Sequence, residues 1–268
     1  MPSGSQLLAN KETGWRSGFK QLLVRENNGW WKSRRWIIQA VIYLFVLNGI
    51  MYAILNAPSD VSLKGIITPA EQVAQALVIF ITLAGLVPAI AVVISGQDSI
   101  IGEKQSGTAA WILSKPVSRP AFVLSKLAAH SLAFFVNISV IQGAVAYVIL
   151  SMTNGSPLPV LPFIEGMLLI FLNLLFYITL TMMLGVLFEQ RGGVIGIGLA
   201  LAIGYQLVVG VAPWTNTIMP WGIIGEGGVA SAVIQGQAVT SFLPVIATIA
   251  WCILFTVVAL WQFGRAEF

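Results

Sequence analysis

Long apolar runs alternate with short polar segments along most of this chain. A helix needs about 20 mostly apolar residues to cross a membrane, and six runs reach that length. We expect spans at about residues 36–56, 73–95, 127–152, 163–188, 194–212 and 242–263. The pattern predicts an all-α polytopic membrane protein, in which residues 36–268 form one transmembrane domain of six helices.

The composition agrees with this fold class. Of the 268 residues, 57% are hydrophobic and 9% are charged, whereas about a quarter of the residues in a soluble domain are charged. The mean hydropathy is +0.87. Cys252 is the only cysteine and His130 the only histidine, which excludes an internal disulfide and a metal site built from cysteine or histidine clusters. We expect neither a metal nor a cofactor in this chain.

Basic residues indicate the orientation, because cytoplasmic loops carry an excess of Lys and Arg. If the N-terminus lies inside, every basic residue except Lys64 falls on the cytoplasmic side, so we expect both termini inside. The net charge of +4 then reflects cations that face anionic membrane lipids, not a nucleic-acid groove. The polar, basic residues 1–35 contain no cleavable signal peptide, which suits a bacterial inner membrane.

Two segments outside the spans have their own signatures. Residues 19–36 mix aromatic and cationic side chains, which predicts an amphipathic helix in the membrane interface within the cytoplasmic N-terminal segment 1–35; a plain positively charged anchor is the alternative. Residues 27–29, Asn-Asn-Gly, should break or kink this helix. Residues 213–244 are too apolar for a solvated loop and too interrupted for a span, and could form short re-entrant helices.

Some chemistry is missing from the sequence. None of the lysines follows a glycine, so the chain lacks the phosphate-binding loop G-x-x-x-x-G-K-[ST], and we do not expect it to be an enzyme. The predicted spans carry no Asp, Lys or Arg near their middles. Ion-coupled carriers usually need such groups, and a proton relay is therefore not expected.

Polar amides occur inside the predicted spans. One interpretation is a translocation path; the other is hydrogen bonding between helices, worth about 0.6 to 2 kcal/mol for each bond. We favour hydrogen bonding for any single residue, and both interpretations stay open. The residues concerned are Asn48, Asn137, Gln142, Asn173 and Gln206.

The fifth predicted span carries small residues at every fourth position: Gly192, Gly196, Ala200 and Gly204. Such a ridge lets two membrane helices approach closely. We expect close helix packing there, either within the subunit or at a dimer interface. The alternative is coincidence in a glycine-rich chain.

The polar segment between the second and third spans is the most informative part of the chain. Residues 99–113 can form a short helix that is stopped by Pro116. Glu103, Lys104 and Gln105 would then face the cytosol. Ile100, Ile101, Trp111, Ile112 and Leu113 would face the membrane or the helix bundle.

The same segment carries a recognisable motif. Glu103 is followed by Gly107-Thr108, then residues 113–119 read L-S-K-P-V-S-R, and Lys126 opens the next span. This order and spacing resembles the pattern E-x-x-x-G-T, L-L-S-x-P-V-S-R and lysine of ABC-2 type permeases, the membrane subunits of a class of ABC transporters. The chain departs slightly, with Ile112-Leu113 in place of paired leucines. The six-span layout is also similar over nearly the whole chain.

The resemblance implies a role for this segment. It would be a coupling helix that docks into a separate ABC ATPase subunit, which binds ATP and Mg²⁺ and hydrolyses the ATP. A second permease copy or a paralogue would complete the transporter. Glu103 and Arg119 are candidates for a charged link to the N-terminal helix or the ATPase, with solvated loop charges as the alternative. The implied coupling residues are Glu103, Lys104, Gly107, Thr108, Pro116 and Arg119.

The functional prediction is thus a permease that forms the translocation path, used for export of an amphipathic or lipid-like substrate. Two alternatives stay open on the sequence. A secondary carrier would use an ion gradient, and a non-transporting scaffold would hold a larger membrane complex together.

Overall fold

The computed structural model describes residues 14–56, 69–225 and 227–266. This part of the chain is nearly all helical and contains no strand. The elements are η1 Gly14–Arg16, α1 Phe19–Trp31, α2 Arg35–Tyr43, η2 Leu44–Gly49, α3 Ile50–Leu55, α4 Pro69–Gln105, α5 Thr108–Leu113, α6 Arg119–Phe134, η3 Phe135–Gln142, α7 Gly143–Asn154, α8 Val160–Leu187, α9 Arg191–Ile203, α10 Tyr205–Val211, η4 Pro213–Thr217, α11 Trp221–Ile224, α12 Val229–Ile234 and α13 Leu243–Arg265.

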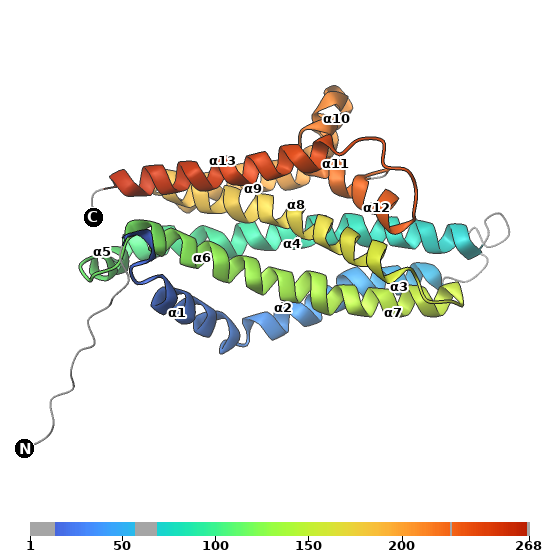
Figure 1. The fold of residues 1–268 in the computed structure, drawn as a ribbon, viewed down its shortest axis with the longest axis horizontal. Helices are drawn as coiled ribbons and strands as arrows, with labels where there is room; N and C mark the ends of the chain where they lie inside the picture. Colours follow the sequence, from blue (N-terminus) through green and yellow to red (C-terminus); the bar gives the residue numbers. More distant parts are fainter. Residues whose placement is uncertain (1–13, 57–68, 226, 267–268) are drawn as a thin grey trace, which may run out of the picture.

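The long helices run side by side along the long axis of the molecule (Figure 1). Helix α8 lies at the centre and packs against α4, α12 and α13. It is apolar on nearly every face, which is the expected composition of a helix that other helices surround. Ile170, Leu174 and Phe176 of α8 are fully buried, together with Phe80 of α4 and Phe134 of α6.

The structure confirms the all-helical fold and contains five or six segments that could span a membrane. Five continuous helical segments are long and apolar enough to cross a membrane: 35–55, 71–105, 119–154, 160–187 and 243–265. The expected fifth span is not a single straight helix, because α9 and α10 meet at an angle of 58°. The bend falls at Gly204, where a side chain would meet the carbonyl of Ala200, and glycine is a common site of such bends. Counting the bent pair gives six spans.

Helix α4 is longer than the sequence predicted. Its 37 residues correspond to about 55 Å of helix, whereas the hydrocarbon core of a bilayer is about 30 Å thick. The helix continues ten residues beyond the expected end at Ser95, because polar residues outside a membrane still satisfy their backbone hydrogen bonds in a helix. The expected separate helix over residues 99–113 is therefore wrong. Residues 99–105 belong to α4, and only Thr108–Leu113 form α5.

The spans that contain α2 and α7 each include a π-helical segment. These segments, η2 and η3, contact each other. Wider turns of this kind occur where a side chain disturbs the regular hydrogen-bond ladder of a helix. Here Asn48 of η2 donates to Gln142 of η3 across 2.8 Å, and Gln142 Nε2 donates to the carbonyl of Ala40 across 3.0 Å.

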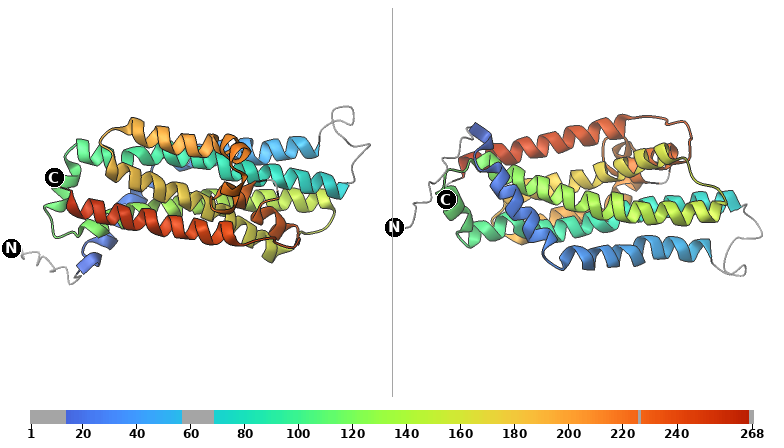
Figure 2. Two further views of the ribbon diagram at one scale, coloured as in Figure 1. Left: turned by 90° about the horizontal axis from the view of Figure 1, so that it is seen from above. Right: turned by 60° about the horizontal axis from the view of Figure 1, so that its bottom comes forward.

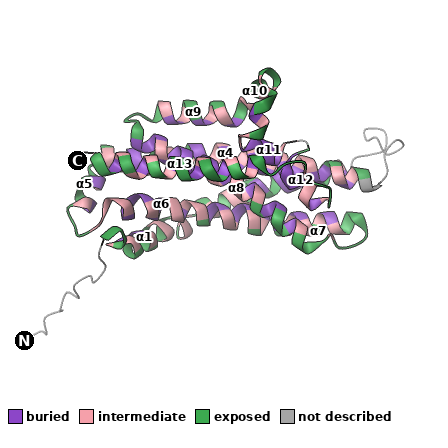
Figure 3. Cartoon of the chain, turned by 45° about the horizontal axis from the view of Figure 1, so that its top comes forward, coloured by how far each residue is buried: buried purple, intermediate pink, exposed green. Residues whose placement is uncertain are grey.

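Short helices connect the bent pair to α13. The elements η4, α11 and α12 fold back against the side of the bundle, short of the end that α4 and α7 reach (Figures 1 and 2). Trp221, Ile223 and Ala230 are buried there, and α11 and α12 contact α4 and α8 (Figure 3). Protein thus covers α11 and α12, as short re-entrant helices require, whereas residues 240–243, which lead into α13, are exposed. Glu226 lies outside the described residues, as do Lys64 and residues 1–13.

Helix α1 lies obliquely across one end of the bundle before the chain turns into α2 (Figure 2). It is continuous through residues 27–29, so the expected break there is wrong. The chain turns at residues 32–34 instead. Ser33 Oγ donates to the carbonyl of Trp30 and Trp36 Nε1 to the carbonyl of Trp31, and both bonds satisfy carbonyls that the end of a helix leaves free.

Candidate functional site

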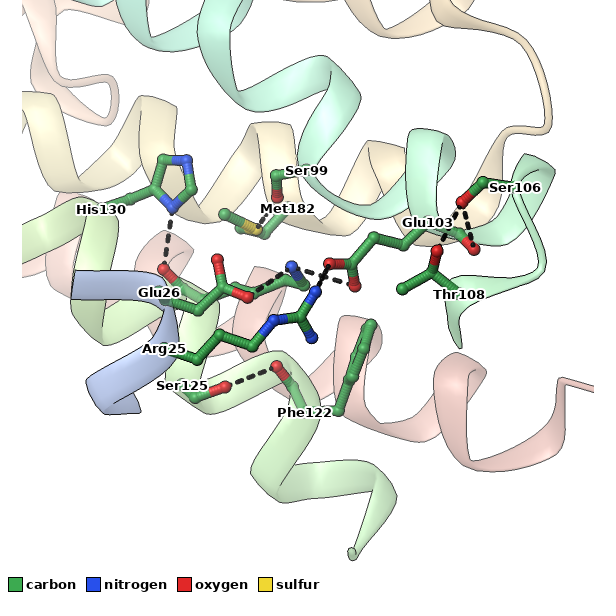
Figure 4. A network of polar contacts seen from close by, with 11 residues as sticks. Arg25, Glu26, Ser99, Glu103, Ser106, Thr108, Phe122, Ser125, His130 and Met182 are labelled. Atoms are coloured by element: carbon green, nitrogen blue, oxygen red, sulfur yellow. Dashed lines mark hydrogen bonds and ion pairs between the residues drawn. The ribbon is translucent and has the colours of Figure 1, made fainter. Parts of the chain in front are cut away.

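Four charged side chains from three helices meet at the end of the bundle that carries α1 and α5 (Figure 4). Lys126 Nζ of α6 lies 2.9 Å from Glu26 Oε1 of α1 and 3.1 Å from Glu103 Oε2 of α4. Arg25 Nη2 of α1 lies 3.3 Å from Glu103 Oε1. We call Arg25, Glu26, Glu103 and Lys126 the charge cluster. It connects the N-terminal helix to the second and third spans.

The members of the charge cluster differ in burial, and burial determines how much each one contributes to the stability of the fold. The Lys126 side chain is 3% exposed, and the two carboxylates are 18% and 19% exposed. Removing one partner of such a pair costs much more than removing an exposed one, because the other charge stays buried without compensation. Arg25 is 48% exposed, so solvent screens its contribution. Lys126 is therefore the centre of the cluster.

Aromatic packing holds α1 against α6 beside the cluster. The Trp30 ring lies 5.8 Å from His130 and 5.8 Å from Phe134, measured between ring centroids. His130 Nδ1 lies 2.9 Å from the carbonyl of Lys126. His130 thus has a structural role at the contact between these helices.

A second connection joins the start of α1 to the loop between α5 and α6. Ser17 Oγ donates to the carbonyl of Pro116, and Ser118 N donates to the carbonyl of Ser17. Ser118 also accepts a bond from Ala121 N as the N-cap of α6. Gly18 has φ of +76°, and a side chain there would meet Val117 at 2.7 Å. Glycine is therefore required where the N-terminal segment crosses this loop.

Helix α5 forms the tip of this end of the molecule (Figure 1). Gly107, with φ of +71°, turns the chain between α4 and α5. Ala109 and Ile112 are buried under α5, but Trp111 is 61% exposed. Lys115 Nζ lies 3.4 Å from the centroid of the Trp111 ring, a cation–π contact that holds the indole in place. Trp111 therefore points away from the bundle, and its contact with the membrane stays a prediction.

Several predicted coupling residues contact other parts of the chain. Glu103 belongs to the charge cluster, which provides the expected charged link to the N-terminal helix. Lys104 Nζ donates to the carbonyl of Val186 across 2.9 Å. Arg119 Nη1 donates to the carbonyl of Gly264 at the end of α13 across 2.6 Å, which joins the start of α6 to α13. Thr108 Oγ1 lies 2.9 Å from Ser106 Oγ at the α4–α5 turn.

Four of the five amides in the spans form hydrogen bonds between helices. Besides the Asn48–Gln142 pair, Asn173 donates to the carbonyl of Gly85 across 3.1 Å and Asn137 to the carbonyl of Trp36 across 3.5 Å. Gln206 of α10 is exposed, and its Nε2 donates to the hydroxyl of the adjacent Tyr205 across 3.4 Å. These contacts support the hydrogen-bonding interpretation, and the translocation path stays a prediction.

The small-residue ridge of α9 faces outwards. A side chain added at Gly192 or Gly196 would meet no atom within 4 Å, and Ala200 is exposed. The close approach of α9 to α4 instead uses Gly198, where a side chain would meet Val93 at 2.7 Å. The ridge is therefore free for a contact outside this subunit, and its use at a dimer interface stays a prediction.

The sequence did not identify three residues of this site in their observed roles. Glu26 and Lys126 are 100 positions apart, and no local pattern pairs them. Exposure of Trp111 could not be read from a helix of six residues. One feature of the sequence points to the ion pairs of α1: the acidic Glu26 follows Arg25 in an otherwise basic segment.

A comparison with known families identifies the chain. A family model described as an ABC-2 family transporter protein matches residues 30–268. The match includes all the membrane-length helices and α5, and it begins near the end of α1. No curated protein matches the chain. The apolar helices fit an integral membrane permease, and members of this family generally work with an ABC ATPase. The chain thus belongs to the ABC-2 family, the membrane permeases of ABC transporters.

Proposed function

We propose that α5 and the charge cluster couple this permease to a separate ATPase subunit. In this proposal the protein lies in a bacterial inner membrane with both termini in the cytosol, and exports an amphipathic or lipid-like substrate. ATP and Mg²⁺ bind to the ATPase. A second permease copy or a paralogue packs against the outward-facing ridge of α9, and the translocation path lies between the two permeases.

The observation that carries the proposal is the position of α5. It combines an exposed indole at the tip of the bundle with buried contacts underneath, from Ala109 and Ile112. Exposed tryptophans are frequent anchors of protein interfaces. The start of α1, α5 and the C-terminal end of α13 lie at the same end of the molecule (Figure 1). The segments there are rich in basic residues, which supports a cytoplasmic position.

The contacts around α5 provide a route for movement. A force on α5 reaches α4 through the short turn at Ser106 and Gly107. The force reaches α6 through the loop between α5 and α6, whose last residue is Ser118. It reaches α1 through the hydrogen bonds between Ser17 and that loop. The charge cluster then holds α1, α4 and α6 together as a unit. The spans that contain α4 and α6 therefore move with α1 when the ATPase moves α5.

The experiment compares ATPase stimulation by the wild-type permease and by Glu103→Gln in liposomes. We expect Glu103→Gln to remain in the membrane, to bind the ATPase and to lose most of the stimulation, because the link between α4 and α1 is broken. Glu189→Gln is the matched control, since Glu189 is exposed at the same end and outside the charge cluster. Wild-type stimulation in Glu103→Gln, or equal losses in both variants, would contradict the coupling role.

A further inference from the structure

A cavity of about 610 Å³ lies beside the charge cluster. Its walls come from α1, the start of α2, the end of α4, α6 and the first residue of α9. Besides the charge cluster, the lining includes Arg35, Gln39, Gln97, Asp98 and Arg191. The cavity is thus a polar space between the first and fifth spans, at the end of the bundle that carries the basic residues.

Cationic side chains outnumber anionic ones around this cavity, at four to three. Arg25 and Lys126 are held by the glutamates of the charge cluster, and Arg191 Nη2 lies 2.7 Å from Asp98 Oδ1. Arg35 is exposed and forms no ion pair with any residue that the structure describes. One guanidinium is therefore available for an anion. Its planar set of donors matches the geometry of a phosphate.

The apolar surroundings of the cavity indicate which class of phosphate-bearing molecule would fit it. Trp30 and the exposed Ile94 belong to the lining, and tryptophans are enriched at the level of lipid headgroups. Helix α2 starts at Arg35 and continues into the first span. Ile38 and Ile42 are exposed and lie three and seven residues after Arg35, on the same face of α2. A molecule with a phosphate in the cavity would therefore have its apolar part beside α2.

We propose that this cavity binds the phosphate headgroup of an anionic phospholipid, with Arg35 as the principal ligand and the acyl chains along α2. The proposal concerns a lipid of the surrounding membrane, and rests on the proposed function only for the cytoplasmic position of the cavity. A free phosphate would satisfy the same guanidinium. The apolar face of α2 next to Arg35 favours the lipid.

The test uses the purified full-length chain in detergent, stripped of lipid and without an ATPase. Native mass spectrometry measures binding of phosphatidylglycerol, of diacylglycerol with the same acyl chains, and of inorganic phosphate. We expect Arg35→Gln to weaken phosphatidylglycerol binding about tenfold, the effect of one charge-assisted hydrogen bond. Arg34→Gln is the matched control, because Arg34 is exposed and adjacent but does not line the cavity. It should bind as the wild type does.

Each other outcome overturns the proposal. Equal weakening in both variants would indicate diffuse attraction between lipid and surface cations. Equal binding of diacylglycerol and phosphatidylglycerol would remove the role of the headgroup. Inorganic phosphate that binds as tightly as the lipid and depends equally on Arg35 would identify a free anion as the ligand. Because no ATPase is present, a failed coupling mechanism would leave these results unchanged, and the two proposals can fail separately.

Discussion

Replacing Lys126 with methionine tests the charge cluster most severely. Lys126→Met keeps an apolar stem of similar length and removes the ammonium between Glu26 and Glu103. Breaking a buried ion pair by removing one partner costs about 3 to 5 kcal/mol. The lower end applies here, because both carboxylates keep some contact with solvent and Arg25 still pairs with Glu103. We therefore expect a loss of about 3 kcal/mol in the free energy of unfolding.

The loss can be measured as a change in melting temperature in mild detergent. For a chain of this size, 1 kcal/mol corresponds to about 2 to 4 °C, so Lys126→Met should melt about 6 to 12 °C below the wild type. Cys252 is buried and is the only thiol, so a thiol-reactive dye reports unfolding without any further change to the chain. Arg25→Gln is the control. Its exposed guanidinium should contribute less than about 1 kcal/mol.

A combined variant separates charge from packing. Lys126→Met together with Glu26→Gln and Glu103→Gln removes the cation and both carboxylates that it faces, and should recover most of the lost stability. The reasoning is refuted if Lys126→Met loses no more stability than Arg25→Gln. It is also refuted if the triple variant is as unstable as Lys126→Met alone, since the cost would then come from packing.

Three further predictions concern α5, α9 and the orientation. Trp111→Ala should weaken ATPase binding at least about tenfold, as expected for an interface anchor. Trp214 of η4 is about as exposed and lies away from α5, so Trp214→Ala should leave binding unchanged; equal ATPase binding by the two variants refutes the docking surface. Gly198→Leu should lower the melting temperature, and Gly196→Leu should instead reduce the dimer yield on size exclusion. A cysteine at Lys64 should react with an impermeant thiol reagent added outside intact cells, and protection there would reverse the orientation.

Much of the fold could be predicted from hydropathy alone. A backbone inside a membrane must satisfy its own hydrogen bonds, so a long apolar run is a helix almost regardless of its particular residues. Hydropathy carries no information about where a helix ends outside the membrane, and the prediction therefore ended α4 at Ser95, ten residues early. The bend at Gly204 was missed for a related reason, since glycine fits both a packing ridge and a break in a membrane helix.

The candidate site was predictable only in part. The motif drew attention to Glu103, and its expected link to the N-terminal helix corresponds to the observed contact with Arg25. The pairing of Lys126 with Glu26 depends on the packing of α1 across α6, which leaves no local signal in the sequence. The sequence left the side of Trp111 open between the membrane and the bundle, because a helix of under two turns has too few positions for periodicity to define a face; the structure excludes the bundle.

Co-purification of the tagged chain from native membranes, with mass spectrometry and an ATPase assay, tests the central claim most directly. The account predicts that an ABC ATPase is recovered with the permease in equal amounts, and that Trp111→Ala loses it while Trp214→Ala retains it. An intact, membrane-inserted chain that brings down no ATPase would contradict the account. Uptake driven by an ion gradient in liposomes would then indicate a carrier, and its absence a scaffold.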